Sequence, residues 1–234
     1  MKKMINYHMI LVYILVLGVL IGIAYGSSKA VTVLSEKNPF TAENTIIIDA
    51  GHGDPDGGTT SCTGITESVI NLEIAMRLDD LMHLLGINTI MTRKNAQSIY
   101  TEGESIAKKK VSDLKNRVNL INNTKNPILV SIHQNYFQDG RYSGAQVFYN
   151  RNENSKQLAA YMQKEFISTL NSGSNRQPKI GQGIYLLEHI NCTGILVECG
   201  FLSNPQEEYI LRTEAYQKKV CCVIAACISS YLYA

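Results

Sequence analysis

The sequence predicts an α/β fold with a single domain, in which a mostly parallel, twisted sheet carries helices on both faces. From Thr45 onward, short apolar runs alternate with stretches whose apolar residues recur at helical spacing. Three of these runs, residues 46–48, 128–132 and 195–197, are apolar almost throughout. Strands that are buried on both faces of a parallel sheet have this composition. The chain of 234 residues is long enough for one domain with its own hydrophobic core.

Six strands are expected where the apolar runs are short. They cover residues 45–49, 87–91, 128–132, 145–149, 184–187 and 195–197. Helices are expected in the longer stretches between them. Thr66 can cap a helix that continues to Leu85, and Gly86 is a typical helix stop. Ser112 is expected to cap a second helix, and two more helices cover about residues 155–170 and 213–231.

The N-terminus has the pattern of an export segment. Lys2 and Lys3 precede an uninterrupted apolar run over residues 9–25. Residues 1–30 are therefore predicted to be a signal peptide or a membrane anchor, and the length of the run favours an uncleaved anchor helix. Residues 31–44 are predicted to be a linker, and residues 45–234 the folded domain. Because Lys2 and Lys3 are expected to stay on the cytoplasmic side of the membrane, the folded domain is expected to be exported across it. The exported domain is then either anchored to the membrane or secreted.

Charge and cysteine content exclude some classes of protein. The net charge of +2, from 22 basic and 20 acidic residues, is too balanced for nucleic acid to be the main partner. The six cysteines contain no CxxC pair, and their connectivity is left open. Four of them lie in apolar stretches and are expected to be buried free thiols: Cys199, Cys221, Cys222 and Cys227.

Polar residues with metal-binding or acid–base capability follow the three apolar runs. His52 comes after the first run, His133 after the second and Glu198 after the third, while Glu67 begins the helix after a glycine-rich loop. Parallel strands bring such residues to one edge of the sheet, where ligand sites form. Two histidines and one carboxylate are a common ligand set for catalytic zinc, which keeps a fourth position open.

Each of these residues also has an ordinary structural interpretation. His52 could be a turn residue, His133 a hydrogen-bonded histidine at a strand end, and Glu67 a first-turn acid that complements the helix dipole. Glu73 competes with Glu67 as the carboxylate ligand. Glu198 directly follows an apolar run, where burying a carboxylate without a purpose is costly. Two arginines, Arg93 and Arg117, are expected to be buried partners of carboxylates.

Four segments together resemble one enzyme family. The segments IIIDAGHGDPDGG, ITESVINLEIAMRL, ILVSIHQNY and GILVECGFLSNPQEE resemble the signature regions of the zinc-dependent N-acetylmuramoyl-L-alanine amidases, the Amidase_3 family, over about residues 45–232. The resemblance implies hydrolysis of the amide between the lactyl group of N-acetylmuramic acid and L-alanine in peptidoglycan. It also implies Zn²⁺ as cofactor, His52, Glu67 and His133 as metal ligands, and Glu198 as the catalytic glutamate. Ala50, Asp54 and Gln134 depart from the family's usual residues without removing a ligand.

Within that family, the layout resembles the germination-specific, CwlD-type amidases of spore formers. Only residues 150–154 separate an expected strand from the next helix, where restrained family members carry a blocking helix. This resemblance implies action on spore-cortex glycan strands with stem peptides, leading to muramic δ-lactam, in the intermembrane space of a forming spore. A regulatory protein partner is a further hypothesis, because no wall-targeting repeat is found in the sequence.

Two other functions are compatible with the residues. A zinc peptidase acting on the stem peptide would use a similar metal set, and its products would differ from those of an amidase. A non-catalytic cell-wall-binding protein is the second alternative. The presence of all four candidate residues argues against it.

Overall fold

The computed structural model describes residues 43–233. The export segment predicted over residues 1–30 and most of the predicted linker lie outside this range. Within it, no helix combines the length and apolarity that a membrane crossing requires.

A six-stranded sheet forms the centre of the domain, with the strand order β2-β1-β3-β6-β4-β5. β1 pairs in parallel with β2 and β3, and β3 pairs in parallel with β6. β4 is antiparallel to β6, so the sheet is mostly parallel, as predicted. The strands are β1 (Thr45–Ala50), β2 (Thr89–Met91), β3 (Pro127–Asn135), β4 (Gln146–Tyr149), β5 (Lys179–Ile180) and β6 (Thr193–Phe201).

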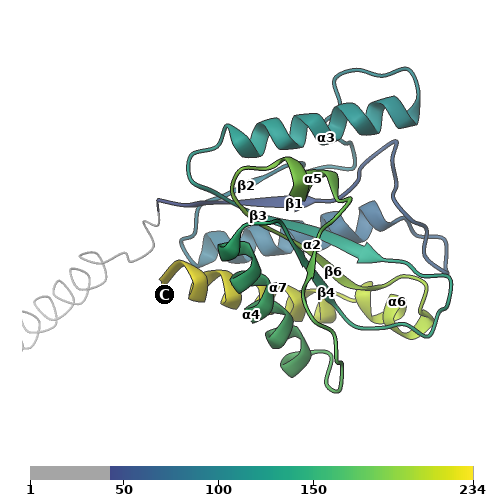
Figure 1. Ribbon diagram of the computed structural model, residues 1–234. Helices are drawn as coiled ribbons and strands as arrows, with labels where there is room; N and C mark the ends of the chain where they lie inside the picture. The colour runs from purple at the N-terminus through teal and green to yellow at the C-terminus, as the bar shows by residue number, and fades with distance from the viewer. Residues whose placement is uncertain (1–42, 234) are drawn as a thin grey trace, which may run out of the picture. The chain divides into compact units, whose positions relative to one another are not determined.

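Helices cover both faces of this sheet (Figure 1). α3 (Ile106–Asn122) and α5 (Tyr185–His189) lie on one face, while α2 (Glu67–Leu84), α4 (Glu153–Thr169) and α7 (Glu214–Tyr233) lie on the other. The short helix α6 (Pro205–Leu211) follows β6, and Asn204 caps it by accepting bonds from the amides of Gln206 and Glu207.

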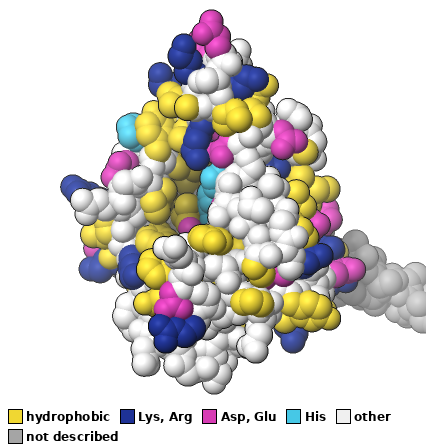
Figure 2. Space-filling model, turned by 90° about the vertical axis from the view of Figure 1, so that its right-hand side faces the viewer, with side chains coloured by type: hydrophobic (Ala, Val, Ile, Leu, Met, Phe, Trp, Pro, Cys, Tyr) yellow, Lys and Arg dark blue, Asp and Glu magenta, His cyan; other side chains and the backbone are white. Residues whose placement is uncertain are grey.

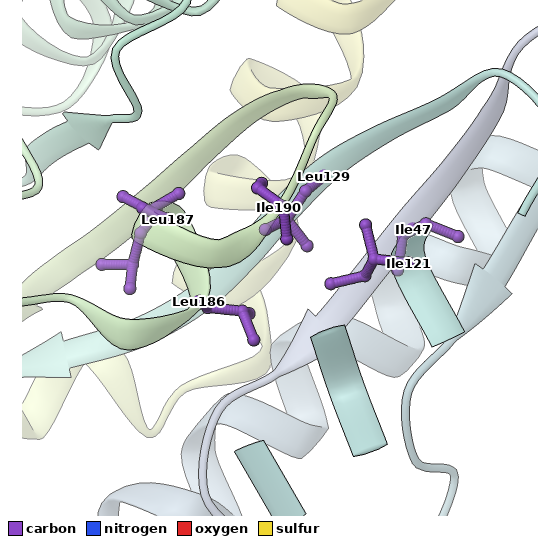
Figure 3. Close-up of a cluster of buried hydrophobic side chains, with 7 residues drawn as sticks. Ile47, Ile121, Leu129, Leu186, Leu187 and Ile190 are labelled. Carbon is purple, nitrogen blue, oxygen red and sulfur yellow. The ribbon is translucent and has the colours of Figure 1, made fainter. Parts of the chain in front are cut away.

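The core on the α3 and α5 face fixes how these two helices sit over the strands (Figure 3). Side chains from three strands, Ile47, Leu129 and Leu196, pack there against Ile121 of α3 and Leu186 of α5. Burying each of these aliphatic side chains contributes roughly 1.5–3 kcal/mol. Because strand residues alternate between faces, residues two further along each strand also point to the α3 and α5 face, beyond this core.

Two predictions about local structure are wrong. Residues 184–187 were expected to form a strand, but they enter the helix α5, and a four-residue apolar run is too short for periodicity to distinguish the two. Ser112 does not cap α3, because Ser105 caps it by accepting a bond from the amide of Lys108. Ser112 is buried inside the helix, where its hydroxyl accepts bonds from the amides of Thr101 and Glu102.

The cysteines are free in the structure, and their burial is mixed. Cys199, Cys221 and Cys227 are buried, as predicted for residues inside apolar stretches. Cys222 is exposed, which contradicts the prediction, because it points outward from α7 between buried neighbours.

Candidate metal centre and active-site cleft

The loop after β1 places His52 in an uncommon backbone conformation. His52 has a φ of +60°, in the left-handed region that few residues other than glycine adopt. Gly51 lets the chain approach His133, because a Cβ on Gly51 would lie 2.2 Å from His133 Nε2. Gly58 has the same function further along, since a Cβ there would lie 2.6 Å from Glu67 Oε2. The two glycines therefore allow the backbone to close around these side chains.

Two buried arginines hold this loop through its carbonyl groups. Arg117, from α3, donates to the carbonyl oxygens of Ala50 at 2.8 Å and His52 at 2.7 Å. Arg93 donates to those of Ala50 at 2.9 Å and Gly51 at 3.0 Å. Burial alone would lower the pKa of Arg117, but neighbouring carboxylates outweigh this effect and raise it. The loop conformation is thus fixed by charge-assisted hydrogen bonds.

Arg117 also pairs with carboxylates, as the sequence predicted. Its Nη1 donates to Asp49 Oδ1 at 2.5 Å, and its Nε donates to Asp113 Oδ2 at 2.8 Å. Ser131 on β3 donates a further bond to Asp49. Burial by itself would raise the pKa of Asp49, but the Arg117 charge and the Ser131 hydroxyl lower it to about 2. Arg93, by contrast, makes its hydrogen bonds to backbone carbonyls.

A carboxylate orients the His52 ring from behind. His52 Nδ1 donates to Asp56 Oδ2 at 2.9 Å, which leaves Nε2 facing Glu67 Oε2 at 3.2 Å. Lys110 of α3 lies 3.0 Å from the same Asp56 oxygen. Burial alone would lower the pKa of His52, but Asp56 and Glu67 raise it to about 9. A carboxylate behind a histidine is the usual arrangement around a bound metal, because it fixes the ring orientation.

Glu67 is the first residue of α2, and its carboxylate is buried between the two histidines. Its Oε1 accepts bonds from Asn71 Nδ2 at 3.1 Å and from the amide of Gln134 at 3.2 Å. Burial would raise the pKa of Glu67, but hydrogen bonds from His133 and His52 hold it well below the usual range. Glu67 is therefore a fixed, ionised carboxylate at the start of the helix.

His133 completes a group of three side chains that could hold a cation. Its Nδ1 lies 2.8 Å from Glu67 Oε1, and its ring centroid lies 5.0 Å from that of His52. One ligand atom from each of His52, Glu67 and His133 lies within 4.8 Å of the others. Two imidazole nitrogens and a carboxylate oxygen are donors that suit zinc. The residues thus fit a zinc ion by their chemistry and by their convergence.

Glu198 lies beside this group on β6. Its Cα is the register partner of His133 on β3, so both side chains leave the same face of the sheet. Its Oε2 is buried and has no hydrogen-bond partner within the described residues. Burial raises the pKa of Glu198 to about 7, with Glu67 adding to the rise and the two histidines opposing it. A carboxylate with such a pKa can both accept and release a proton near neutral pH.

His52, His133 and Glu198 line one cleft of about 340 Å³ between α3 and the segment that leads into α5, whereas the buried Glu67 is not among the residues that line it. Lys110 and Leu114 line the cleft from α3, and residues 183–186 line it from the α5 side. Figure 2 shows the hollow at the end of the sheet, with a histidine inside it and hydrophobic side chains around it.

Comparison with known proteins assigns the family. The sequence profile of the N-acetylmuramoyl-L-alanine amidases (Amidase_3) matches residues 46–230, nearly the whole of the described domain. The chain belongs to the N-acetylmuramoyl-L-alanine amidase family. This amidase is 37% identical to the germination-specific N-acetylmuramoyl-L-alanine amidase of Bacillus subtilis over 177 residues, 75% of this chain and 74% of that protein.

Solved structures agree with this family. The CwlD amidase from Clostridioides difficile, determined in complex with the GerS lipoprotein, is 38% identical and superposes with a TM-score of 0.78 over 81% of this chain and 98% of that one. The catalytic domain of CwlV, an N-acetylmuramoyl-L-alanine amidase from Bacillus (Paenibacillus) polymyxa var. colistinus, is 29% identical with a TM-score of 0.69, covering 81% of this chain and 98% of that one.

Sequence reasoning about the amidase missed the residues that orient the site. Asp56 lies four residues after His52 and Asn71 four residues after Glu67, and this spacing was the available signal. The competing carboxylate, Glu73, lies away from the cleft, since it accepts a bond from Gln217 of α7. Gln134, an unusual residue for the family, donates to Asn71 at 3.3 Å on the opposite side of β3 from the cleft.

Proposed function

We propose that this amidase is a zinc-dependent hydrolase that cuts the amide between the lactyl group of N-acetylmuramic acid and L-alanine. The observation that carries the proposal is the convergence of the His52, Glu67 and His133 ligand atoms within 4.8 Å, next to Glu198. A zinc ion held there would lower the pKa of a bound water to about 7 and polarise the substrate carbonyl.

The protein's own residues supply the rest of the mechanism. Asp56 and Asn71 hold His52 and Glu67 in the orientation that points their ligand atoms to one place. Glu198, as general base, accepts the proton of the attacking water with the buried oxygen that no other group occupies. It then donates that proton to the departing alanine nitrogen, because an amide nitrogen leaves poorly unless it is protonated.

The open cleft supports action on a polymer. β4 ends at Tyr149 and α4 begins at Glu153, so only three residues connect them, and no blocking helix is inserted there. A glycan strand with its stem peptides therefore has access from outside to His133 and Glu198, which line the cleft. We infer that control of the enzyme resides in other features, such as a protein partner.

The relatives support a role in spores. The Bacillus subtilis relative is named for germination, and the Clostridioides difficile relative was solved with a lipoprotein. We propose that this amidase acts on cortex peptidoglycan, outside the cytoplasmic membrane, and that residues 1–30 export it. Cleavage would free the lactyl carboxyl group from which muramic δ-lactam forms. A lipoprotein or other partner is proposed to assist zinc retention or substrate engagement.

Digestion of purified peptidoglycan tests the proposed reaction. The full-length protein should release peptides that begin with L-alanine and leave the glycan chain intact, as read by mass spectrometry. A chelator should stop the release, and added zinc should restore it. Shortened stem peptides that remain attached to muramic acid would indicate the peptidase alternative. Binding to peptidoglycan with no products would indicate the wall-binding alternative.

A further inference from the structure

An exposed aromatic surface lies on the loop that connects β3, the strand that carries His133, to β4. Tyr136, Phe137 and Tyr142, called here the aromatic rim, have 49%, 53% and 48% of their surfaces exposed. The rim begins three residues after His133, at the end of the sheet where the cleft opens. Solvent-exposed aromatic groups of this kind are typical of binding sites, because water solvates them poorly.

The rim is built as a rigid surface. The rings of Phe137 and Tyr142 meet edge to face, with centroids 4.9 Å apart. Tyr142 stacks on Phe201, whose ring also lies 4.8 Å from the Arg176 guanidinium carbon. Phe201 is buried and lies three residues after Glu198 on the same strand. The rim is therefore packed directly on the strand that carries the proposed general base.

Hydrogen bonds fix the backbone of the loop as well. The amide of Phe137 donates to Ser203 Oγ at 3.1 Å, and Asn204 Nδ2 donates to the carbonyl of Tyr142 at 3.3 Å. The buried carboxylate of Glu207 accepts bonds from the amides of Gly144 and Phe201, both at 2.8 Å. A surface held in this way loses little conformational freedom when a ligand binds.

We propose that the aromatic rim is a subsite for the sugar rings of the glycan strand on either side of the muramic acid whose amide is cut. This rests on the proposed function, in which the lactyl group of that muramic acid reaches His133 and Glu198. The sugar that carries the group must then lie at the mouth of the cleft, and its neighbours must extend along the protein surface. Pyranose rings present faces of C–H bonds that pack on aromatic rings, and the rim directly follows β3, the strand that carries His133 into the cleft.

The α3 wall of the cleft has a different chemistry from the aromatic rim. Lys110 and Asp56 line it with charges, which suits a stem peptide that carries carboxylates and amides better than it suits a sugar face. The glycan is therefore assigned to the rim and the peptide to the α3 side.

Two substrates with the same peptide but different glycans test this assignment on the full-length zinc-loaded protein. One is N-acetylmuramoyl-L-alanyl-D-isoglutamine, with a single sugar, and the other is a strand of several disaccharides with that peptide. Phe137→Ala should raise KM for the strand about fivefold, with a much smaller effect on the single-sugar substrate. Phe137→Trp should restore the KM for the strand. Tyr209→Ala, at an exposed aromatic on α6 outside the rim, is the control and should change neither.

If Phe137→Ala raises KM equally for both substrates, or raises it for neither, the subsite proposal is wrong. Calorimetry of peptide-free glycan strands measures binding to the rim without any cleavage. It therefore distinguishes a failure of the subsite proposal from a failure of the proposed amidase function. If the wild type cleaves neither substrate, the proposed amidase mechanism is wrong, and the binding measurement still tests whether the rim binds glycan. Weaker strand binding by Phe137→Ala than by wild type or Tyr209→Ala supports the subsite, and equal binding by all three rejects it.

Discussion

His133 and Glu198 are register partners on the adjacent parallel strands β3 and β6. Their side chains leave the same face of the sheet, two residues beyond Ser131 and Leu196, which also form a pair. The separation of the proposed ligand and the proposed base is therefore set by the backbone hydrogen bonds of the sheet. A sheet interior varies less than a loop, so this pair is pre-positioned for reaction.

Replacing the proposed base should remove the reaction and leave the metal. Glu198→Gln keeps the shape of the side chain but cannot accept a proton, so kcat should fall by about 10²–10⁴-fold. Zinc content, measured by atomic absorption, should stay near that of the wild type. Glu104→Gln, on an exposed residue before α3, is the control and should keep full activity. A Glu198→Gln enzyme with wild-type kcat would assign the base to another group.

Removing the carboxylate behind His52 should weaken metal retention. Asp56→Ala frees the ring that Asp56 holds at 2.9 Å, and loss of such a partner typically costs about 10–100-fold in metal affinity. Competition with a chromogenic zinc chelator measures the affinity directly. Asp54→Ala, in the same loop but with an exposed side chain, should retain zinc normally. Identical affinities for the two variants would mean that Asp56 does not orient the ligand.

The buried arginine should be a major determinant of stability. Arg117→Met leaves Asp49 buried without its partner and releases the carbonyls of the His52 loop, so the free energy of unfolding should drop by about 3–5 kcal/mol. Urea denaturation followed by circular dichroism measures the change. Lys115→Met, an exposed position on the same helix, should stay within about 0.5 kcal/mol of wild type. A loss no larger than that control would contradict the role assigned to Arg117.

The same ion pair predicts how stability depends on pH. Burial would raise the pKa of Asp49, but Arg117 and Ser131 lower it to about 2 from an ordinary value of 3.8. A depressed folded-state pKa contributes stability that is complete above about pH 5 and is lost as pH falls toward 2. The stability advantage of wild type over Asp49→Asn should therefore shrink by about 2 kcal/mol between pH 5 and pH 2. An advantage that is independent of pH over that range would show that the Asp49 pKa is not depressed.

Much of the fold was predictable because the buried strands are apolar almost throughout and the long helices have regularly spaced apolar residues. Residues 46–48, 128–132 and 195–197 lie in β1, β3 and β6, and the long helices α2, α4 and α7 were recognised from their spacing. The short elements were not predictable. Residues 184–187 have no periodicity that separates strand from helix, and Ser105 and Ser112 are equally good capping residues by type.

The candidate site was predictable to the level of its four central residues. His52, Glu67, His133 and Glu198 lie together as the strand-end argument and the family resemblance implied. The residues that orient them were not predictable in the same way. Asp56, Asn71 and Lys110 are ordinary polar residues in sequence, and their partners depend on how α2 and α3 pack beside the β1 loop.

The central claim is that His52, Glu67 and His133 together bind one zinc ion. Anomalous diffraction from crystals of the zinc-loaded protein tests this claim most directly. Data collected on both sides of the zinc absorption edge should reveal one zinc ion bound by His52 Nε2, a Glu67 carboxylate oxygen and His133 Nδ1, each at about 2.0–2.2 Å. Glu198 should lie beside the ion without binding it. Zinc bound elsewhere, or bound with any of these three side chains turned away, would contradict the account.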